Sequence, residues 1–216
     1  MNTMVKYTTS TNIVRDVKND IQYIPTPNSL NVFKRIAKGF NSGQHSFNII
    51  GSYGTGKSSF LWALEKNLDQ NLPIFEPLNG QFNGLKKFDF LKLIGESDSF
   101  IEVFNNQLGI DINSKPKETI QALDAKYKKV NKKGAALLIV IDEFGKFLEY
   151  AAKNDPDKEL YFIQQIAEYV NDASKNILFL VTLHQNFGAY SKALSKDQRQ
   201  EWEKVRGRLI DVAFDE

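Results

Sequence analysis

The stretch Gly51-Ser52-Tyr53-Gly54-Thr55-Gly56-Lys57-Ser58 decides the fold of this 216-residue chain. Its three glycines permit a tight turn, because glycine adopts backbone conformations that other residues resist. The segment before it, Ser46–Ile50, is short and ends in two β-branched residues, which is typical of a buried strand. Apolar residues at helical spacing follow it, namely Phe60, Leu61, Leu64 and Leu68. The local order is therefore strand, glycine loop, helix.

The same stretch matches G-x-x-x-x-G-K-[ST], the phosphate-binding loop or P-loop. Such a loop points successive backbone N–H groups into one concavity, beside a helix N-terminus that favours negative charge. Lys57 is expected to reach the β- and γ-phosphates and to assist catalysis, and the Ser58 hydroxyl to bind Mg²⁺. The alternative, a glycine turn without a ligand, is disfavoured by the flanking strand and helix. The residues expected to contact the nucleotide are Gly51, Ser52, Tyr53, Gly54, Thr55, Gly56, Lys57, Ser58 and Ser59.

A carboxylate pair, Asp142 and Glu143, ends the most hydrophobic run of the chain, Ala136–Ile141. A run that is apolar on both faces is typical of a central parallel strand covered by helices. An acidic residue in this place can hold Mg²⁺ together with the P-loop hydroxyl, and its neighbour can act as general base towards a water molecule. We therefore assign Asp142 to the metal and Glu143 to catalysis. Without the P-loop, the pair would be only the common polar end of a strand.

The remaining elements alternate between strands and helices, which predicts a mostly parallel sheet with right-handed crossovers. Asn28 or Ser29 is expected to cap a helix that ends between Gly39 and Gly43. Pro73–Leu78 is interpreted as an edge strand, because its prolines cannot donate to a ladder. The other predicted elements are mostly helical material from Leu85 to Lys133, helices through Tyr150, from Asp157 to Ala173 and from Lys192 to Val205, and strands at Ile177–Thr182 and Leu209–Phe214.

Composition narrows the classes of site and location. The chain has no cysteine, which excludes disulfides and thiolate metal sites. Its two histidines, His45 and His184, are too few and too far apart in sequence to indicate a metal site. The polar start Met1–Tyr7 lacks a signal-peptide core, and no apolar run approaches the roughly 20 residues that span a bilayer. We expect a cytoplasmic protein without membrane contact.

With these motifs, the sequence resembles the P-loop ATPases that have an extra strand between the two motifs, including the AAA+ and STAND families. The resemblance rests on the P-loop, on the run ending in Asp142-Glu143 and on the polar end of Ile177–Thr182, and it spans residues 25–214. It implies an α/β fold with three α/β/α layers and a five-stranded, mostly parallel sheet of order 5-1-4-3-2. It also implies ATP as ligand, Mg²⁺ as cofactor and adenine contact by Ile24–Pro27. Residues 1–24 would form an arm and 25–216 a core domain without a C-terminal lid.

The resemblance also implies roles for residues outside the two motifs. Thr182 ends a strand beside the metal strand, so it takes the place of the residue that senses the γ-phosphate or the attacking water. His184 and Gln185 are alternatives, although packing is the favoured role for His184, and a locally bonded Thr182 hydroxyl is a third interpretation. Three of the five arginines cluster where these families present an arginine to a neighbouring subunit: Arg199, Arg206 and Arg208. Ordinary surface ion pairs are the alternative for these arginines.

The leading functional hypothesis is an ATP-hydrolysing motor or switch in a homo-oligomer or larger protein complex. A weaker similarity, to ATPases of prokaryotic antiviral defence, rests on Tyr53, Phe144–Glu149 and Leu183–Gln185. The alternative is a non-hydrolysing ATP-dependent scaffold or switch, whereas the lack of a suitably placed N-K-x-D motif disfavours a GTPase. The net charge of +2 gives no support for a nucleic-acid-coating surface. The lysine-rich stretch Thr119–Lys133 leaves nucleic acid open as a partner, although such runs are usually solvated.

Overall fold

The computed structural model describes residues 11–18, 22–69, 72–75, 81–192 and 194–215. Within these residues, parallel strands form one five-stranded sheet of spatial order β2-β3-β4-β1-β5. This is the predicted order 5-1-4-3-2 counted from the other edge. The strands are β1 (Ser46–Ile50), β2 (Phe88–Ile94), β3 (Ala136–Asp142), β4 (Ile177–Leu183) and β5 (Ile210–Ala213).

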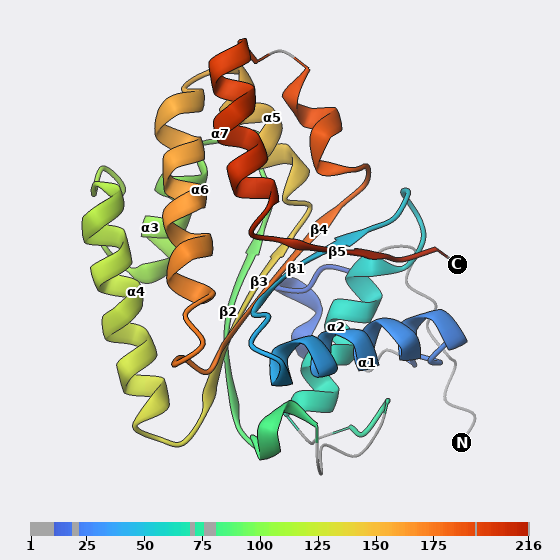
Figure 1. The fold of residues 1–216 in the computed structure, drawn as a ribbon. Coiled ribbons are helices and arrows are strands. Elements are labelled where there is room, and N and C mark those ends of the chain that lie inside the picture. Colours follow the sequence, from blue (N-terminus) through green and yellow to red (C-terminus); the bar gives the residue numbers. More distant parts are fainter. Residues whose placement is uncertain (1–10, 19–21, 70–71, 76–80, 193, 216) are drawn as a thin grey trace.

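Helices cover both faces of the sheet, which gives the predicted three layers (Figure 1). One face carries α1 (Pro27–Asn41) and α2 (Lys57–Leu68). The helices on the other face are α3 (Phe100–Leu108), α4 (Pro116–Asn131), α5 (Gly145–Lys153), α6 (Pro156–Val170) and α7 (Lys196–Arg206). Short 3-10 turns lie at Arg15–Lys18, Phe82–Gly84 and Phe187–Ser191.

The central strand β3 explains why its sequence is apolar throughout. Leu137, Ile139 and Ile141 pack into the core beneath α3 to α7. Leu138 and Val140 pack into a second core beneath α1 and α2. Burial of such side chains stabilises a fold by about 1.5–3 kcal/mol each. Because side chains pack on both faces of β3, the backbone at its carboxyl end, where Asp142 lies, is fixed in position.

The predicted position of the second strand is wrong. The strand next to β3 is β2, which lies within the stretch that we expected to be mostly helical after Leu85. Residues 73–75 of the predicted strand are irregular, and 76–78 fall outside the described residues. The backbone N–H groups of Ile74 and Phe75 each donate to Oδ1 of Asn67 at 2.8 Å. A side chain at the end of α2 therefore satisfies donors that a sheet ladder would otherwise bind.

Helix boundaries differ from the prediction by a few residues. The N-cap of α1 is Thr26, not Asn28 or Ser29. Its Oγ1 accepts from the Ser29 N–H at 3.1 Å, while the Thr26 N–H donates to Ser29 Oγ at 2.9 Å, which is a capping box. The last predicted helix begins later, at Lys196 with Ser195 as its N-cap, because a 3-10 turn precedes it.

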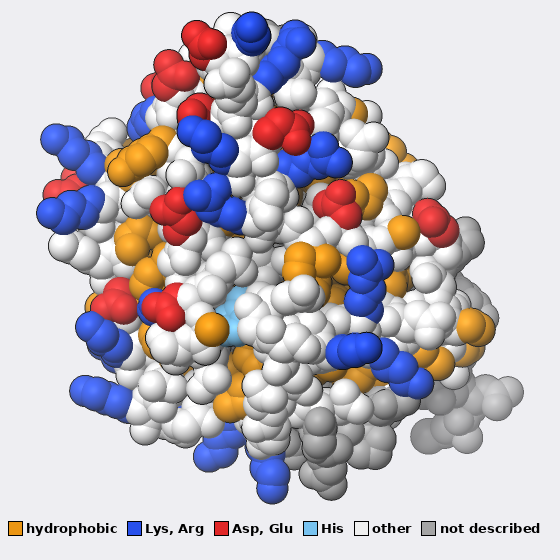
Figure 2. Space-filling view, viewed as in Figure 1, with side chains coloured by type: hydrophobic (Ala, Val, Ile, Leu, Met, Phe, Trp, Pro, Cys, Tyr) orange, Lys and Arg blue, Asp and Glu red, His pale blue; other side chains and the backbone are white. Residues whose placement is uncertain are grey.

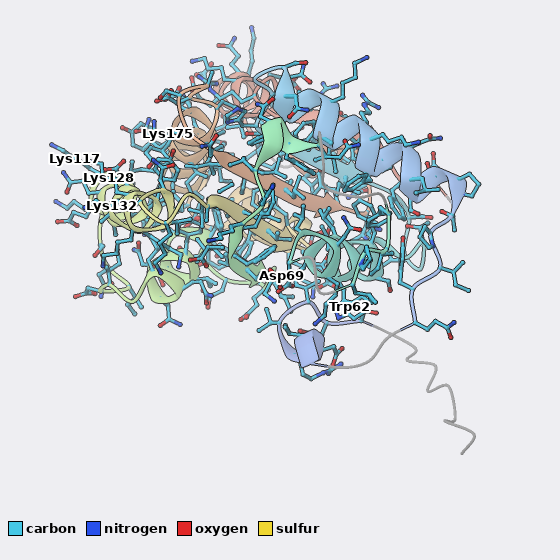
Figure 3. The ribbon with its side chains drawn as sticks, turned by 90° about the horizontal axis from the view of Figure 1, so that it is seen from below. Trp62, Asp69, Lys117, Lys128, Lys132 and Lys175 are labelled. Atoms are coloured by element: carbon cyan, nitrogen blue, oxygen red, sulfur yellow. The ribbon has the colours of Figure 1, made fainter. Side chains whose placement is uncertain are left out.

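The described part of the predicted N-terminal arm packs against α2. Ile13 is only 1% exposed, and Thr11 Oγ1 lies 2.9 Å from Ser59 Oγ in the first turn of α2. The Trp62 indole donates to the Asp16 carbonyl at 3.2 Å. Figure 3 shows Trp62 beside this turn of the chain. Residues 11–18 are thus tied to the helix that follows the P-loop.

A buried ion pair strengthens this tie. Lys92 Nζ on β2 lies 2.8 and 2.9 Å from the two carboxylate oxygens of Glu65 on α2, and it also donates to the Ile13 carbonyl at 2.9 Å. The side chains of Lys92 and Glu65 are 14% and 10% exposed. The pair therefore joins the edge strand, α2 and the segment 11–18.

Removal of one partner of this pair should destabilise the protein. We expect Lys92→Met to lower the free energy of unfolding by about 3 kcal/mol, because breaking a buried pair leaves an uncompensated charge. Chemical denaturation would measure the loss. The Lys92→Met/Glu65→Leu double variant should recover most of it, and Lys153→Met, at an exposed lysine of α5, is the matched control. A Lys92→Met variant as stable as the parent would contradict this account of the pair.

Candidate functional site

The P-loop connects β1 to α2 at the carboxyl edge of the sheet (Figure 1). Gly54 and Gly56 have φ values of 83° and 84°, in the left-handed region that favours glycine. Gly51 is required for a different reason, since a Cβ there would lie 2.1 Å from the Phe214 carbonyl oxygen just beyond β5. The loop is therefore shaped by its own glycines and by the neighbouring strand.

Lys57 lies inside this loop. Its Nζ donates to the carbonyl oxygens of Gly51 at 2.5 Å and Ser52 at 2.7 Å, and the residue is only 5% exposed. Burial lowers the pKa of Lys57, while the nearby carboxylates of Asp142 and Glu143 act in the opposite direction. The Lys57 ammonium and the two carboxylates thus lie close enough to affect one another, as a site for phosphate and a metal ion requires.

Asp142 is the centre of a small hydrogen-bond network and is 4% exposed. Its Oδ1 accepts from the Thr182 hydroxyl at 2.6 Å and from the Glu143 N–H at 3.1 Å. The same N–H donates to Thr182 Oγ1 at 2.9 Å. The Asp142 carboxylate is therefore fixed in orientation, with Oδ2 making no hydrogen bond to the part of the chain that the structure describes.

Glu143 has an unusual backbone, with φ of 55°. A non-glycine residue in this region costs of order 1–3 kcal/mol, and such strain gathers at functional sites. Gly95, just after β2, approaches so closely that a Cβ would lie 1.9 Å from the Glu143 carbonyl oxygen. The Glu143 carboxylate pairs with Lys146 on α5, and this bond raises the pKa of Lys146.

The residues present fit a Mg²⁺ ion bound jointly with a nucleotide. Magnesium in such sites takes one or two carboxylates and completes its shell with phosphate oxygens and water. Asp142 offers a free carboxylate oxygen, and the Ser58 hydroxyl stands in the first turn of α2 beside Lys57. Among the described residues, no group of three or more His, Asp or Glu side chains could hold a metal alone. The ion would therefore depend on the phosphates of the ligand.

The Thr182 side chain belongs to the Asp142 network in this structure. Its single proton is donated to Asp142 and its oxygen accepts from the Glu143 N–H. Contact between Thr182 and a γ-phosphate stays a prediction. The hydroxyl does more than satisfy local backbone, since it orients the proposed metal carboxylate.

A stack between Tyr53 and His184 was missed by the sequence interpretation. Tyr53, on the P-loop, is 77% exposed, yet its ring lies 3.5 Å from the imidazole of His184 between centroids, with an interplanar angle of 18°. Both ring nitrogens of His184 are shielded from solvent and make no hydrogen bond with any described residue. Burial lowers the pKa of His184, and the Lys57 ammonium lowers it further. No sequence signal joins these two residues, because their contact depends on the sheet order.

The three arginines do not meet the P-loop of their own chain. Arg199 donates to the Leu194 carbonyl at 3.0 Å, and Arg206 pairs with Glu203 at 3.2 Å. Arg208 pairs with Glu168 at 2.5 Å. Arg208 also precedes β5, whose first residue pairs with Phe47 near the start of β1. Arg208 therefore lies towards the amino ends of the strands, whereas the P-loop lies at their carboxyl ends. A role at another subunit stays a prediction.

Surface charge is mixed. On the face seen in Figure 2, Lys and Arg side chains alternate with Asp and Glu over α6 and α7. Lys117 and Lys128 of α4 and Lys132, just after its end, gather with Lys175 at one side of the molecule (Figure 3). Lys128 pairs with Asp124 at 2.7 Å, and Lys175 pairs with a neighbouring carboxylate, so half of this basic group is compensated. In the described part of the chain, no helix is both long and apolar enough to cross a membrane.

Comparisons with known proteins identify the fold. No protein-family model and no curated protein sequence matches the chain. The solved Aeropyrum pernix ORC2 protein matches with a TM-score of 0.56 both in its ADPNP-ADP complexes and in its ADP form, at 16% and 18% identity, over 93% of this chain and 52% of that one. Caenorhabditis elegans PCH-2 matches with a TM-score of 0.52 at 16% identity, over 92% and 45%. This chain spans about half the length of these proteins, and it has the P-loop nucleoside triphosphatase fold.

Proposed function

We propose that this chain binds ATP with Mg²⁺ and hydrolyses it, as an AAA+/STAND-like core domain that acts as a motor or switch within a homo-oligomer or larger complex. The observation that carries the proposal is the position of Lys57, which lies inside a P-loop and in the electrostatic range of Asp142 and Glu143. A phosphate chain, a metal and an attacking water need these three groups in one place.

Each residue has a distinct task in this proposal. The backbone N–H groups of the P-loop and the Lys57 ammonium bind the β- and γ-phosphates. Ser58 and Asp142 would hold Mg²⁺, which neutralises charge on the phosphates when bound. Glu143 accepts a proton from water that attacks the γ-phosphate. Thr182 orients Asp142 through its 2.6 Å hydrogen bond.

A phosphate-release assay with the purified chain tests this proposal. We expect release from ATP that depends on Mg²⁺ and stops when EDTA is added. A rise in activity per protomer with protein concentration would indicate sites completed between subunits. Absence of ATP binding to the folded chain at millimolar nucleotide would contradict the proposal. Repeating the assay with GTP tests whether the site prefers adenine to guanine.

The arginine cluster gives a sharper test of assembly. We expect alanine at one of Arg199, Arg206 or Arg208 to abolish turnover and to leave ATP affinity nearly intact. The lost guanidinium would contact the phosphates bound by a neighbouring subunit, not those of its own chain. Phosphate release and calorimetric ATP binding measure the two effects. Lys204→Ala, on the helix that carries Arg199 and Arg206, is the control.

Mixing experiments decide whether the arginine acts in trans. An inactive arginine variant mixed with Glu143→Gln should regain activity, since one subunit supplies the intact carboxylate and the other the intact arginine. Unchanged hydrolysis by all three alanine variants would reject the trans arginine and leave Arg206 and Arg208 as surface ion pairs.

We also propose a nucleic-acid partner and a role in antiviral defence. The basic group on α4 is the surface that would meet nucleic acid, and repeating the phosphate-release assay with DNA and with RNA tests it. Stimulation that falls with salt would support binding, because phosphate contacts release counterions. A role in antiviral defence rests on sequence resemblance. Two of the three segments that carry that resemblance, Tyr53 and Leu183–Gln185, meet in the aromatic stack.

A further inference from the structure

We infer that His184, and not Thr182, reads the γ-phosphate in this chain, and that Tyr53 couples His184 to the P-loop by stacking on it. The inference rests on the proposed function and assigns one specific task within the same site. Three observations support it. The Thr182 hydroxyl already donates to Asp142, the ring nitrogens of His184 have no hydrogen-bond partner among the described residues, and Tyr53 stands on the loop that would hold the phosphates.

The Thr182 hydroxyl has no proton to spare. A hydroxyl carries one donor, and that of Thr182 points at Oδ1 of Asp142 at 2.6 Å. The N–H of Glu143 occupies a lone pair of the same oxygen at 2.9 Å. A hydrogen bond to a γ-phosphate would break a charge-assisted bond to a carboxylate, which is among the stronger hydrogen bonds in proteins. Thr182 therefore serves Asp142.

His184 follows directly on the last residue of β4 and lies next to the P-loop. The Gly51 N–H donates to the Leu183 carbonyl at 3.1 Å, so the root of the P-loop is bonded to the residue before His184. Burial raises the pKa of Tyr190 and the nearby backbone of His184 lowers it, so Tyr190 lies against the main chain of His184. The His184 ring is thus presented from a fixed backbone.

The imidazole of His184 has unused hydrogen-bonding capacity. Both nitrogens are shielded from solvent without a partner among the described residues. Shielded polar atoms in folded proteins nearly always have partners, so an exception calls for a ligand or another explanation. A neutral imidazole offers one N–H donor and one acceptor. A phosphate oxygen could accept from this N–H while the imidazole stays neutral.

Tyr53 gives the ring a connection to the state of the loop. Its own backbone follows Ser52, whose carbonyl now accepts from Lys57 at 2.7 Å. Bound phosphates would compete with the Ser52 carbonyl for the Lys57 ammonium. Loss of this hydrogen bond would change the backbone at Ser52, the residue before Tyr53. Tyr53 is largely exposed and its ring stacks on His184, so a shift of the loop moves the stack.

Nucleotide affinities test the inference. Calorimetry would measure the dissociation constants of ADP and of ADPNP, a non-hydrolysable ATP analogue, each with Mg²⁺. We expect His184→Ala to weaken ADPNP about tenfold or more and to change ADP less than twofold, since only ADPNP carries the γ-phosphate. His184→Asn, which restores a donor, should recover part of the preference. Gln185→Ala, at the other residue considered for this role, should keep the parental preference, and Gln107→Ala, at an exposed residue of α3, is the matched control.

A second measurement does not depend on His184 variants alone. In a Tyr53→Trp variant, the indole should stack on His184, and its fluorescence should change more with ADPNP than with ADP. Adding His184→Ala should remove that difference, whereas the buried Trp62 and Trp202 supply a constant background.

The outcomes separate this inference from the proposed function. If both nucleotides bind and His184→Ala leaves the ADPNP-to-ADP preference unchanged, or if Gln185→Ala removes it instead, the inference is wrong while the ATP site stands. If neither nucleotide binds to the parent, the proposed function itself fails.

Discussion

Glu143→Gln should retain ATP affinity and lower turnover by about 10²- to 10⁴-fold, the range that general-base catalysis contributes. The amide has nearly the size of the carboxylate but accepts no proton from water. The left-handed backbone at Glu143 and its N–H contacts with Asp142 and Thr182 do not depend on the side chain, so the metal site should survive. Phosphate release and calorimetry measure turnover and affinity.

The control for this substitution is Glu149→Gln on the exposed side of α5. It makes the same chemical change without touching the carboxylate pair, and we expect parental turnover. If Glu143→Gln and the parent release phosphate at one common background rate while both bind ATP, the protein is the non-hydrolysing scaffold or switch that we named as the alternative.

Lys57→Met should lower ATP affinity by roughly 10- to 150-fold, because a hydrogen bond to a charged group contributes about 1.5–3 kcal/mol. In the nucleotide-free protein it removes a partly desolvated charge and also two hydrogen bonds to the Gly51 and Ser52 carbonyls, so we expect little net change in thermal stability. Burial lowers the pKa of Lys57, so the folded state binds the proton less well than the unfolded state. The resulting destabilisation is present while Lys57 is protonated in the folded state, and it is lost as pH rises from the lowered folded pKa to the ordinary lysine pKa.

Calorimetry and thermal unfolding at neutral pH measure affinity and stability separately, with Lys153→Met as the control for loss of a lysine. A large loss of affinity with little change in stability would show that Lys57 serves the ligand more than the fold. Parental ATP affinity in Lys57→Met would place the phosphates elsewhere and contradict the proposed site.

The elements next to the P-loop were predictable because their signals are local. The P-loop spacing and the doubly apolar strand before Asp142 located two strands and the carboxylate pair. The sheet order followed from the resemblance. The edge strand was not found, since β2 is only partly buried and its apolar pattern is weak. The stretch Pro73–Leu78 also suggested an edge strand, where the Asn67 side chain instead binds the backbone of Phe75.

The Tyr53–His184 stack could not be predicted, for a different reason. Tyr53 lies after β1 and His184 after β4, and only the insertion of β4 beside β1 brings the two loops together. A lone histidine in sequence is more often a packing residue. Its unpartnered nitrogens are a property of the surrounding fold, and no periodicity or spacing encodes them.

The hydrogen bonds on both sides of β1 determine which part of the P-loop can move. The Gly51 N–H donates to β4, and the Phe214 N–H donates to the Ile50 carbonyl at 2.7 Å, so the root of the loop is fastened from both neighbours. Amide hydrogen exchange at Gly51 should therefore be slow and independent of nucleotide. Exchange at Ser52 and Tyr53, beyond the fastened root, should respond to ATP, which makes the tip of the loop the part that transmits the bound state.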